Sequence, residues 1–170
     1  DGDYDFNVSE SVTSDSQGIK YMMNDDGSTC WVCGHEDNYS ATIIIPEVHE
    51  GRYVTSIACL YDCSSLTSIT IPESVTSIKG YTFQGCSGLK SITIPESVTS
   101  IGDYAFSGCS GLSSIVVETG NTVYDSREHC NAFIKTSDNT LVVGCMNTII
   151  PSSVTSIGGS AFSGCSGLTS

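Results

Sequence analysis

The sequence predicts a solenoid of the α/β type, in which short coils stack on one another and share a parallel β-sheet. Three residue types, each recurring at a spacing of 23 residues, point to this fold. The recurring residues are Cys63, Cys86 and Cys109, Pro72 and Pro95, and Phe83 and Phe106. A supersecondary unit that repeats at a fixed period cannot bury its apolar side alone, so successive units must stack.

Each repeat contains a short strand. In the segment Leu89-x-x-Ile92-x-Ile94, alternation along a strand places both isoleucines on one side, which must face the core. Pro95 follows immediately and has no amide hydrogen to donate, so it ends the strand. Five segments of this type occur, at residues 43–45, 69–71, 92–94, 115–117 and 148–150.

The rest of the repeat predicts a second extended piece and a turn. Residues 98–101 form a second short extended segment. Ala105, Phe106, Cys109 and Leu112 then follow at a spacing close to one helical turn. We therefore expect a short helix or 3₁₀ turn that carries the phenylalanine inward.

The repeats divide the chain into two parts. Residues 41–170 contain about five coils, of which one is lengthened by ten residues between 118 and 151, and the last is truncated after Leu168. Residues 1–40 form a β-rich leader, expected to cap the first coil. The leader is acidic, because residues 1–50 hold eleven acidic residues against Lys20 alone.

The repeat resembles the BspA-like leucine-rich repeats, also called the Treponema pallidum type. The resemblance lies in Cys109-Ser-Gly-Leu112-x-x-Ile115 and in Ile94-Pro95-x-x-Val98-x-x-Ile101-Gly102-x-x-Ala105-Phe106. It implies a right-handed leucine-rich repeat coil with its parallel sheet on the concave face. It also implies a secreted or surface-anchored bacterial protein, with a protein or glycan ligand on a host or bacterial surface.

Charge and hydropathy narrow the classes of partner. The net charge is −13, so binding to nucleic acid or to an anionic membrane would add repulsion rather than release counterions. The sequence contains no transmembrane run, and we expect no insertion into a membrane.

Nine cysteines are present, and four of them (Cys63, Cys86, Cys109 and Cys165) share one inward position of the repeat. Stacked copies would lie about 4.8 Å apart with parallel side chains. A disulfide prefers Cβ atoms about 3.8 Å apart and converging, so we expect free thiols. Free thiols in a secreted protein indicate an anaerobic habitat.

The segment Cys30-Trp31-Val32-Cys33 has the spacing of a redox dithiol or of half a zinc site. Alternation along a strand would place the two cysteines on opposite faces, and no second ligand pair with suitable spacing follows. No nucleophile elbow, phosphate loop or metalloprotease motif occurs, so we expect no catalytic residues, metal or cofactor.

Alternation along the strands also defines a candidate binding face. If Ile92 and Ile94 point inward, Ser91 and Thr93 point outward. Equivalent positions form two rows across the sheet. The first row contains Thr42, Ser68, Ser91, Ser114 and Asn147, and the second contains Ile44, Thr70, Thr93, Val116 and Ile149.

The lengthened coil is the second candidate, because loops that project from a rigid scaffold often carry recognition. It gathers aromatic and charged residues in a short span: Tyr124, Asp125, Arg127, Glu128, His129 and Lys135. Residues 132–135 and 141–143 flank a polar segment and predict a hairpin.

Together these features favour a non-enzymatic surface or secreted module that mediates protein binding or adhesion to host or bacterial macromolecules. Its binding residues would be Tyr124, Asp125, Arg127, Glu128 and His129, with Ser68, Thr70, Ser91, Thr93 and Ser114. One alternative is a structural spacer that presents another domain. The other is an extracellular thiol oxidoreductase that uses Cys30 and Cys33.

Overall fold

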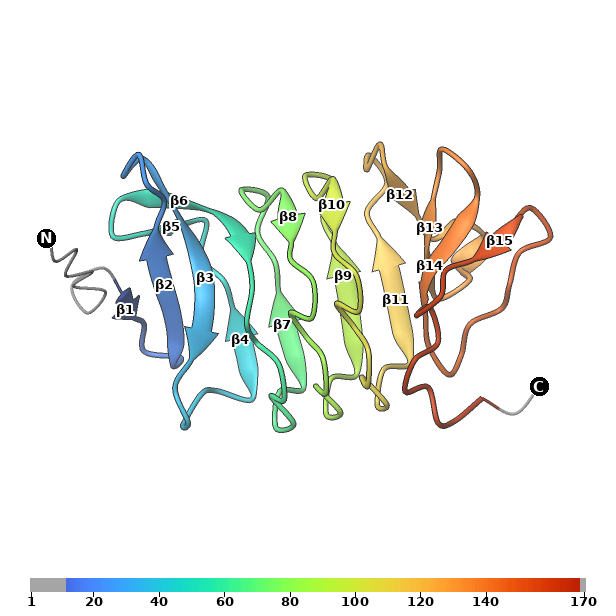
Figure 1. The fold of residues 1–170 in the computed structure, drawn as a ribbon, viewed down its shortest axis with the longest axis horizontal. Helices are drawn as coiled ribbons and strands as arrows, with labels where there is room; N and C mark the ends of the chain where they lie inside the picture. Colours follow the sequence, from blue (N-terminus) through green and yellow to red (C-terminus); the bar gives the residue numbers. More distant parts are fainter. Residues whose placement is uncertain (1–11, 169–170) are drawn as a thin grey trace, which may run out of the picture.

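The computed structural model describes residues 12–168, and in this part of the chain the coils stack along one long axis (Figure 1). Residues 1–11 of the expected leader and residues 169–170 lie outside the described part. Strands run across the axis, and successive coils lie side by side from the N-terminal to the C-terminal end. This arrangement confirms the predicted solenoid.

The N-terminal segment is β-rich and joins the sheet of the coils. β1 (Val12–Ser14), β2 (Ile19–Met23) and β3 (Thr29–His35) are antiparallel, and the chain turns between β2 and β3 at Gly27, whose φ is +68°. β3 then pairs in parallel with β6 (Arg52–Ile57). The short β5 (Val48–His49) pairs with β6 in the antiparallel direction. Main-chain hydrogen bonds therefore run without a break from this hairpin into the first coil.

Each regular coil contributes two short strands on two sides of the core. On one side lie β4 (Thr42–Ile44), β7 (Ser68–Thr70), β9 (Ser91–Ile94) and β11 (Ser114–Val117), which run side by side in Figure 1. On another side, β6 is followed in parallel by β8 (Ser77–Ile78) and β10 (Ser100–Ile101). Buried aliphatic residues of both sets, such as Ile92 and Ile78, form one continuous core.

The first set of strands is split into two parallel pairs. β4 pairs with β7 and β9 pairs with β11, and the repeat sets the register, with Thr42 opposite Ser68 and Ser91 opposite Ser114. Between β7 and β9 the described residues form no strand ladder, although the Lys90 amide donates to the Thr67 carbonyl at 3.2 Å. The parallel sheet predicted from the repeat is therefore interrupted at this point.

Turns rather than helices carry the phenylalanines inward. In the turn after β10, the amide of Ser107 donates to Tyr104 and that of Cys109 to Phe106, at 3.1 and 3.2 Å, the i→i+3 pattern of a 3₁₀ turn. Within residues 12–168, η2 (Arg127–His129) is the one helical element. The Phe106 ring stacks on that of Phe83, with centroids 5.2 Å apart, and meets the Phe133 ring edge-on at 5.5 Å.

All nine cysteines are free, including the four at the inward position of the repeat, for which the spacing predicted free thiols. The inward cysteines also satisfy main-chain groups of the preceding coil. The thiol of Cys86 donates to the Leu60 carbonyl at 3.0 Å, and that of Cys109 donates to the Phe83 carbonyl at 3.1 Å. At this position the side chain is both an apolar filler and a weak hydrogen-bond donor.

The lengthened coil forms its own sheet, in the order β12 (Tyr124–Asp125), β13 (Ala132–Lys135), β14 (Thr140–Gly144) and β15 (Ser156–Ile157). β13 and β14 form the predicted antiparallel hairpin. The expected fifth strand at residues 148–150 is wrong, since these residues adopt no strand. Its place beside β11 is taken by two side chains: Ser126 Oγ accepts from the Val117 amide at 2.9 Å, and Asn131 Oδ1 accepts from the Ile115 amide at 3.4 Å.

Replacing Phe106 with alanine is expected to destabilise the fold by about 3–5 kcal/mol, because it removes a buried ring that contacts two others. Urea unfolding measures the loss. Val116→Ala, at a side chain that is 44% exposed, is the matched control and should change stability little. Equal effects of the two substitutions would contradict this description of the core.

Thiol reactivity tests the stacked cysteines. Burial raises the pKa of Cys109 to about 12, so its thiolate is absent at neutral pH. We expect Cys59, the exposed cysteine, to react first with an aromatic disulfide reagent, and Cys86 and Cys109 to react only after unfolding. Cys59→Ser should remove the fast phase, whereas rapid labelling of Cys86 or Cys109 in the native protein would overturn the prediction.

Candidate functional site

The outward rows lie where strand alternation placed them. Ser91, Thr93 and Thr70 are exposed, Ser68 and Ser114 are half-buried, and the neighbouring Ile92 and Ile94 are buried. The rows end at β11, since Asn147 and Ile149 are exposed but belong to no strand. We call the outer surface of β4, β7, β9 and β11 the sheet face.

The sheet face is hollowed where β7 and β9 do not form a ladder. A depression of about 250 Å³ lies there. Its lining includes Ser68, Thr70, Ser91 and Thr93, together with Glu118 from the end of β11. The interruption of the sheet therefore turns a flat row of small polar residues into a shallow site.

A second, larger depression lies at the lengthened coil. Its volume is about 410 Å³, and its lining includes Asp125, Arg127, Glu128 and His129, with Val116 of the sheet face. Glu118 lines this depression as well as the first. The structure thus brings the two groups of candidate residues onto one surface, which we call the joined surface.

Glu118 gives the joined surface its charge. It stands where the preceding repeat has Pro95, and it lies near Glu73 and Glu96 of the two preceding coils. Partial desolvation raises the pKa of Glu118, and the hydrogen bond and charge of Glu73 raise it further. Two carboxylates at equivalent positions of stacked coils, Glu73 and Glu96, together with the adjacent Glu118, make this part of the surface negative.

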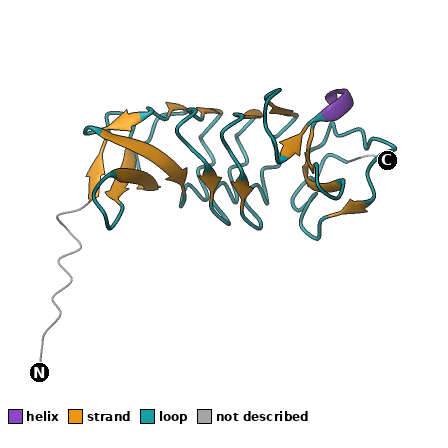
Figure 2. Cartoon of the chain, turned by 90° about the horizontal axis from the view of Figure 1, so that it is seen from above, coloured by secondary structure: helices purple, strands orange, loops and turns teal. Residues whose placement is uncertain are grey.

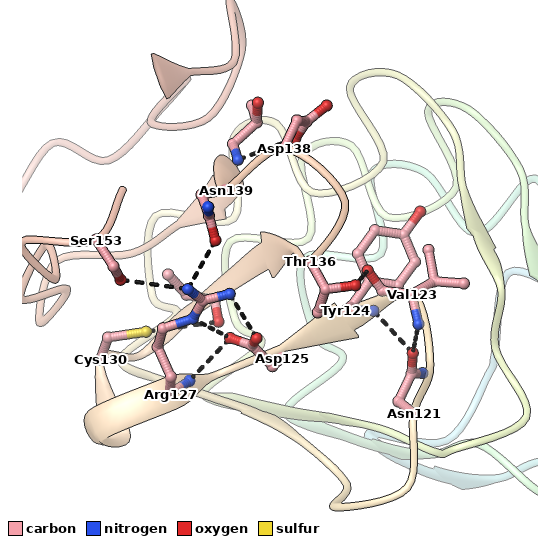
Figure 3. A network of polar contacts seen from close by, with 12 residues as sticks. Asn121, Val123, Tyr124, Asp125, Arg127, Cys130, Thr136, Asp138, Asn139 and Ser153 are labelled. Atoms are coloured by element: carbon pink, nitrogen blue, oxygen red, sulfur yellow. Dashed lines mark hydrogen bonds and ion pairs between the residues drawn. The ribbon is translucent and has the colours of Figure 1, made fainter. Parts of the chain in front are cut away.

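Arg127 is held by its own chain (Figure 3). Its Nε and Nη2 donate to the two carboxylate oxygens of Asp125 at 2.8 and 2.7 Å. Its Nη1 donates to Asn139 Oδ1 at 2.8 Å and to Ser153 Oγ at 3.2 Å. The guanidinium therefore ties β12 to the β13–β14 turn and to the segment before β15, and the Asp125 carboxylate raises its pKa.

Tyr124 differs from its expected role as an exposed contact, because its side chain is 7% exposed and packs in the core. Its hydroxyl accepts a hydrogen bond from the Ile101 amide at 3.1 Å. Asn121 Oδ1 in turn accepts from the amides of Val123 and Tyr124, both at 2.9 Å (Figure 3). The spacing of the repeat did not single out Asn121, since its role depends on a turn that only the lengthened coil contains.

Among the five predicted binding residues of the lengthened coil, Glu128 and His129 are the exposed ones. Both lie in η2, which projects near the C-terminal end in Figure 2. Their φ values of +58° and +53° fall in the left-handed region, which non-glycine residues seldom adopt. The turn thus holds two polar side chains in solvent beside the clamped Arg127.

The Cys30 and Cys33 pair lacks the geometry of a redox dithiol. β3 buries Cys30 and leaves Cys33 half-buried on the other face. Burial raises the pKa of both thiols, whereas a redox cysteine needs a lowered pKa. Within residues 12–168, no three or more His, Cys, Asp or Glu side chains are arranged so that they could hold a metal ion. No helix in the same residues is long and apolar enough to cross a membrane.

Comparison with known protein families identifies the repeat. A family model described as BspA type leucine-rich repeat region matches residues 54–170 with six copies. The chain belongs to the BspA-type leucine-rich repeat family. Comparison with curated proteins finds no significant match.

Solved structures of other leucine-rich repeat proteins are similar to this chain, and the one with a TM-score above 0.5 shares its fold. A protein from Bacteroides ovatus is 23% identical with a TM-score of 0.55, and the match covers 89% of this chain and 44% of that one. A cell surface protein from Faecalibacterium prausnitzii is 19% identical with a TM-score of 0.48, covering 91% and 68%. The T. pallidum leucine-rich repeat protein is 17% identical with a TM-score of 0.48, covering 92% and 90%.

Arg127→Lys is expected to lower the free energy of unfolding by about 1–2 kcal/mol, because an ammonium group cannot contact Asp125, Asn139 and Ser153 together. Urea unfolding again provides the measurement. His129→Asn is the control, because asparagine tolerates a left-handed backbone and the ring it replaces is exposed. An unchanged midpoint for Arg127→Lys would show that the clamp contributes nothing to stability.

Proposed function

We propose that this BspA-type chain is a non-enzymatic module of a bacterial cell-surface or secreted protein, and that it binds a protein partner through the joined surface. The observation that carries the proposal is the continuity of the surface at Glu118, which lines both depressions. Membership of a leucine-rich repeat family supports the proposal, because such scaffolds present extended surfaces for binding.

The chemistry of the joined surface favours a partner with a basic or hydroxyl-rich contact region. Exposed Thr70 and Thr93 offer hydroxyls, and Val116 offers an apolar contact. The carboxylates of Glu73, Glu96 and Glu118 add negative charge, in a chain whose net charge is already −13. Such charge raises the rate of encounter with basic partners and suppresses acidic ones.

Recognition at the lengthened coil would rest on Glu128 and His129. Arg127 and Asp125 satisfy each other, and Tyr124 is buried. These three residues would position the contact, while the two exposed side chains of η2 would meet the partner.

Binding of the full chain to a panel of purified extracellular-matrix proteins, measured by biolayer interferometry, tests the proposal. We expect saturable binding to at least one protein of the panel, lost in Thr93→Arg, which obstructs the centre of the sheet face. Thr99→Arg, at an exposed threonine just before β10, is the matched control and should bind normally. Saturable binding that both variants retain would exclude the sheet face, and absence of binding throughout would favour the spacer alternative.

Charge at Glu118 should make the binding depend on pH. Because its pKa is raised, Glu118 loses its negative charge earlier than an ordinary glutamate as the pH falls. Binding of a basic partner should therefore weaken on acidification, and Glu118→Gln should weaken it about two- to fivefold at neutral pH. The pH dependence should be smaller in this variant, and an identical dependence in both proteins would contradict the role of Glu118.

A further inference from the structure

Two tyrosines form an exposed stack on the turns that follow β8 and β10. Tyr81 and Tyr104 are one repeat apart, their ring centroids lie 5.3 Å apart, and their planes differ by 10°. Their side chains are 51% and 44% exposed. Both residues have a left-handed backbone, with φ of +60° and +57°, which is rare for a bulky side chain. The turns therefore present the two rings at the same place in successive coils.

The stack ends at Tyr104 because the next turn carries a small residue. By the repeat, Ala161-Phe162 corresponds to Ala105-Phe106, so Ser160 stands at the position of Tyr104. A third aromatic ring is thus missing from the stack. Since Tyr81 covers one face of the Tyr104 ring and the coils stack along one axis, the other face is turned towards residues 158–161.

The two turns also separate at this point. Between the first two turns, the amides of Tyr81 and Phe83 donate to the carbonyls of Asp103 and Ala105, at 3.0 and 2.7 Å. Within residues 12–168, the amides of Tyr104 and Phe106 have no such partner on the following turn, which is joined through Gly108 N to Ser163 O at 2.9 Å. The β13–β14 hairpin lies between, and Phe106 meets Phe133 instead of Phe162.

A pocket of about 280 Å³ fills the space between the separated turns. Tyr104 and Ser160 line it, with Tyr124 and Val142 as apolar lining. Asp103 and Lys135 add one carboxylate and one ammonium group. Apart from Tyr124, the pocket shares no lining residue with the two depressions of the joined surface. The proposed protein-binding function does not use it.

We propose that this pocket binds one pyranose unit of an oligosaccharide. Its volume lies near the lower end of ligand cavities, which hold about 300–1,000 Å³, so it suits one ring rather than a long ligand. The exposed face of Tyr104 carries the negative charge of a π-system, which attracts the polarised C–H groups of a sugar face. Asp103 offers hydrogen-bond acceptors, Lys135 offers donors, and the Ser160 hydroxyl can do both. The hydroxyl groups of a sugar ring need partners of both types.

The balance of charges in the pocket distinguishes this ligand from others. The Lys135 ammonium group also lies 4.0 Å from the Asp138 carboxylate, so its charge is already partly offset. The pocket therefore has no excess of positive charge that would select an anion such as a phosphate. The charged residues Asp103 and Lys135 in its lining do not suit a lipid chain. A neutral, hydroxyl-rich ring that is apolar on one face matches both the stacked tyrosine and the polar groups.

Saturation-transfer NMR with the full chain tests the site. The probes are short oligosaccharides that end in glucose, galactose, mannose or N-acetylglucosamine, at up to millimolar concentration. We expect transfer to the C–H protons of one terminal sugar, with the Kd raised at least tenfold in Tyr104→Ala and little changed in Tyr104→Phe. Ser160→Tyr, which supplies the missing ring, should abolish binding. Tyr61→Ala, at a 52% exposed tyrosine that does not line the pocket, is the control.

Three results would overturn the assignment. They are the absence of transfer to every sugar, binding that survives both Tyr104→Ala and Ser160→Tyr, and preferential saturation of this pocket by a short peptide. Thermal unfolding of each variant establishes that it is folded, and Tyr104→Ala keeps the test decisive if Ser160→Tyr does not fold. The Thr93→Arg variant should bind the sugar normally, so failure of the sheet-face proposal would leave this one standing.

Discussion

Stacking of each coil on the next is the interaction on which the rest of the structure depends. A single coil has too few residues to enclose its own isoleucines, so Ile92 and Ile94 are buried because the coils before and after them complete the core. The row of Phe83, Phe106 and Phe133 carries that contact from the regular coils into the lengthened one. Main-chain bonds and the inward thiols hold neighbouring regular coils in register, which positions their outward residues.

The lengthened coil satisfies the same stacking requirement with different chemistry. β11 needs partners for its outer edge, and Ser126 and Asn131 supply side-chain oxygens where a strand would have supplied carbonyls. The hairpin β13–β14 continues the core through Phe133, while Arg127 and Asn121 hold the surrounding turns. Because the lengthened coil does not have the shape of a regular coil, it leaves a depression beside β11 and a pocket between the turns around Tyr104 and Ser160.

A charged or aromatic residue in an insertion can therefore serve the scaffold rather than the ligand. Arginine is a residue type that often contacts partners, yet the guanidinium of Arg127 donates its hydrogen bonds to Asp125, Asn139 and Ser153. Tyr124 is likewise occupied, since its hydroxyl accepts from the Ile101 amide. Two exposed tyrosines that form a stack, Tyr81 and Tyr104, lie instead on the regular turns, where the period of 23 residues places one ring above the next.

The sequence by itself determined the repeat, the inward isoleucines and phenylalanines, the outward rows as far as β11, the free inward thiols and the β13–β14 hairpin. These features depend on alternation, period and local geometry, which the order of residues contains. Only the tertiary structure decided that residues 148–150 leave the sheet, that Tyr124 is buried, that Glu118 joins the two depressions and that the turns separate beyond Tyr104. Each of these outcomes depends on which side chain fills the space between two coils or pairs with a given main-chain group. Contacts between residues far apart in the chain decide this, and the local order of residues does not contain them.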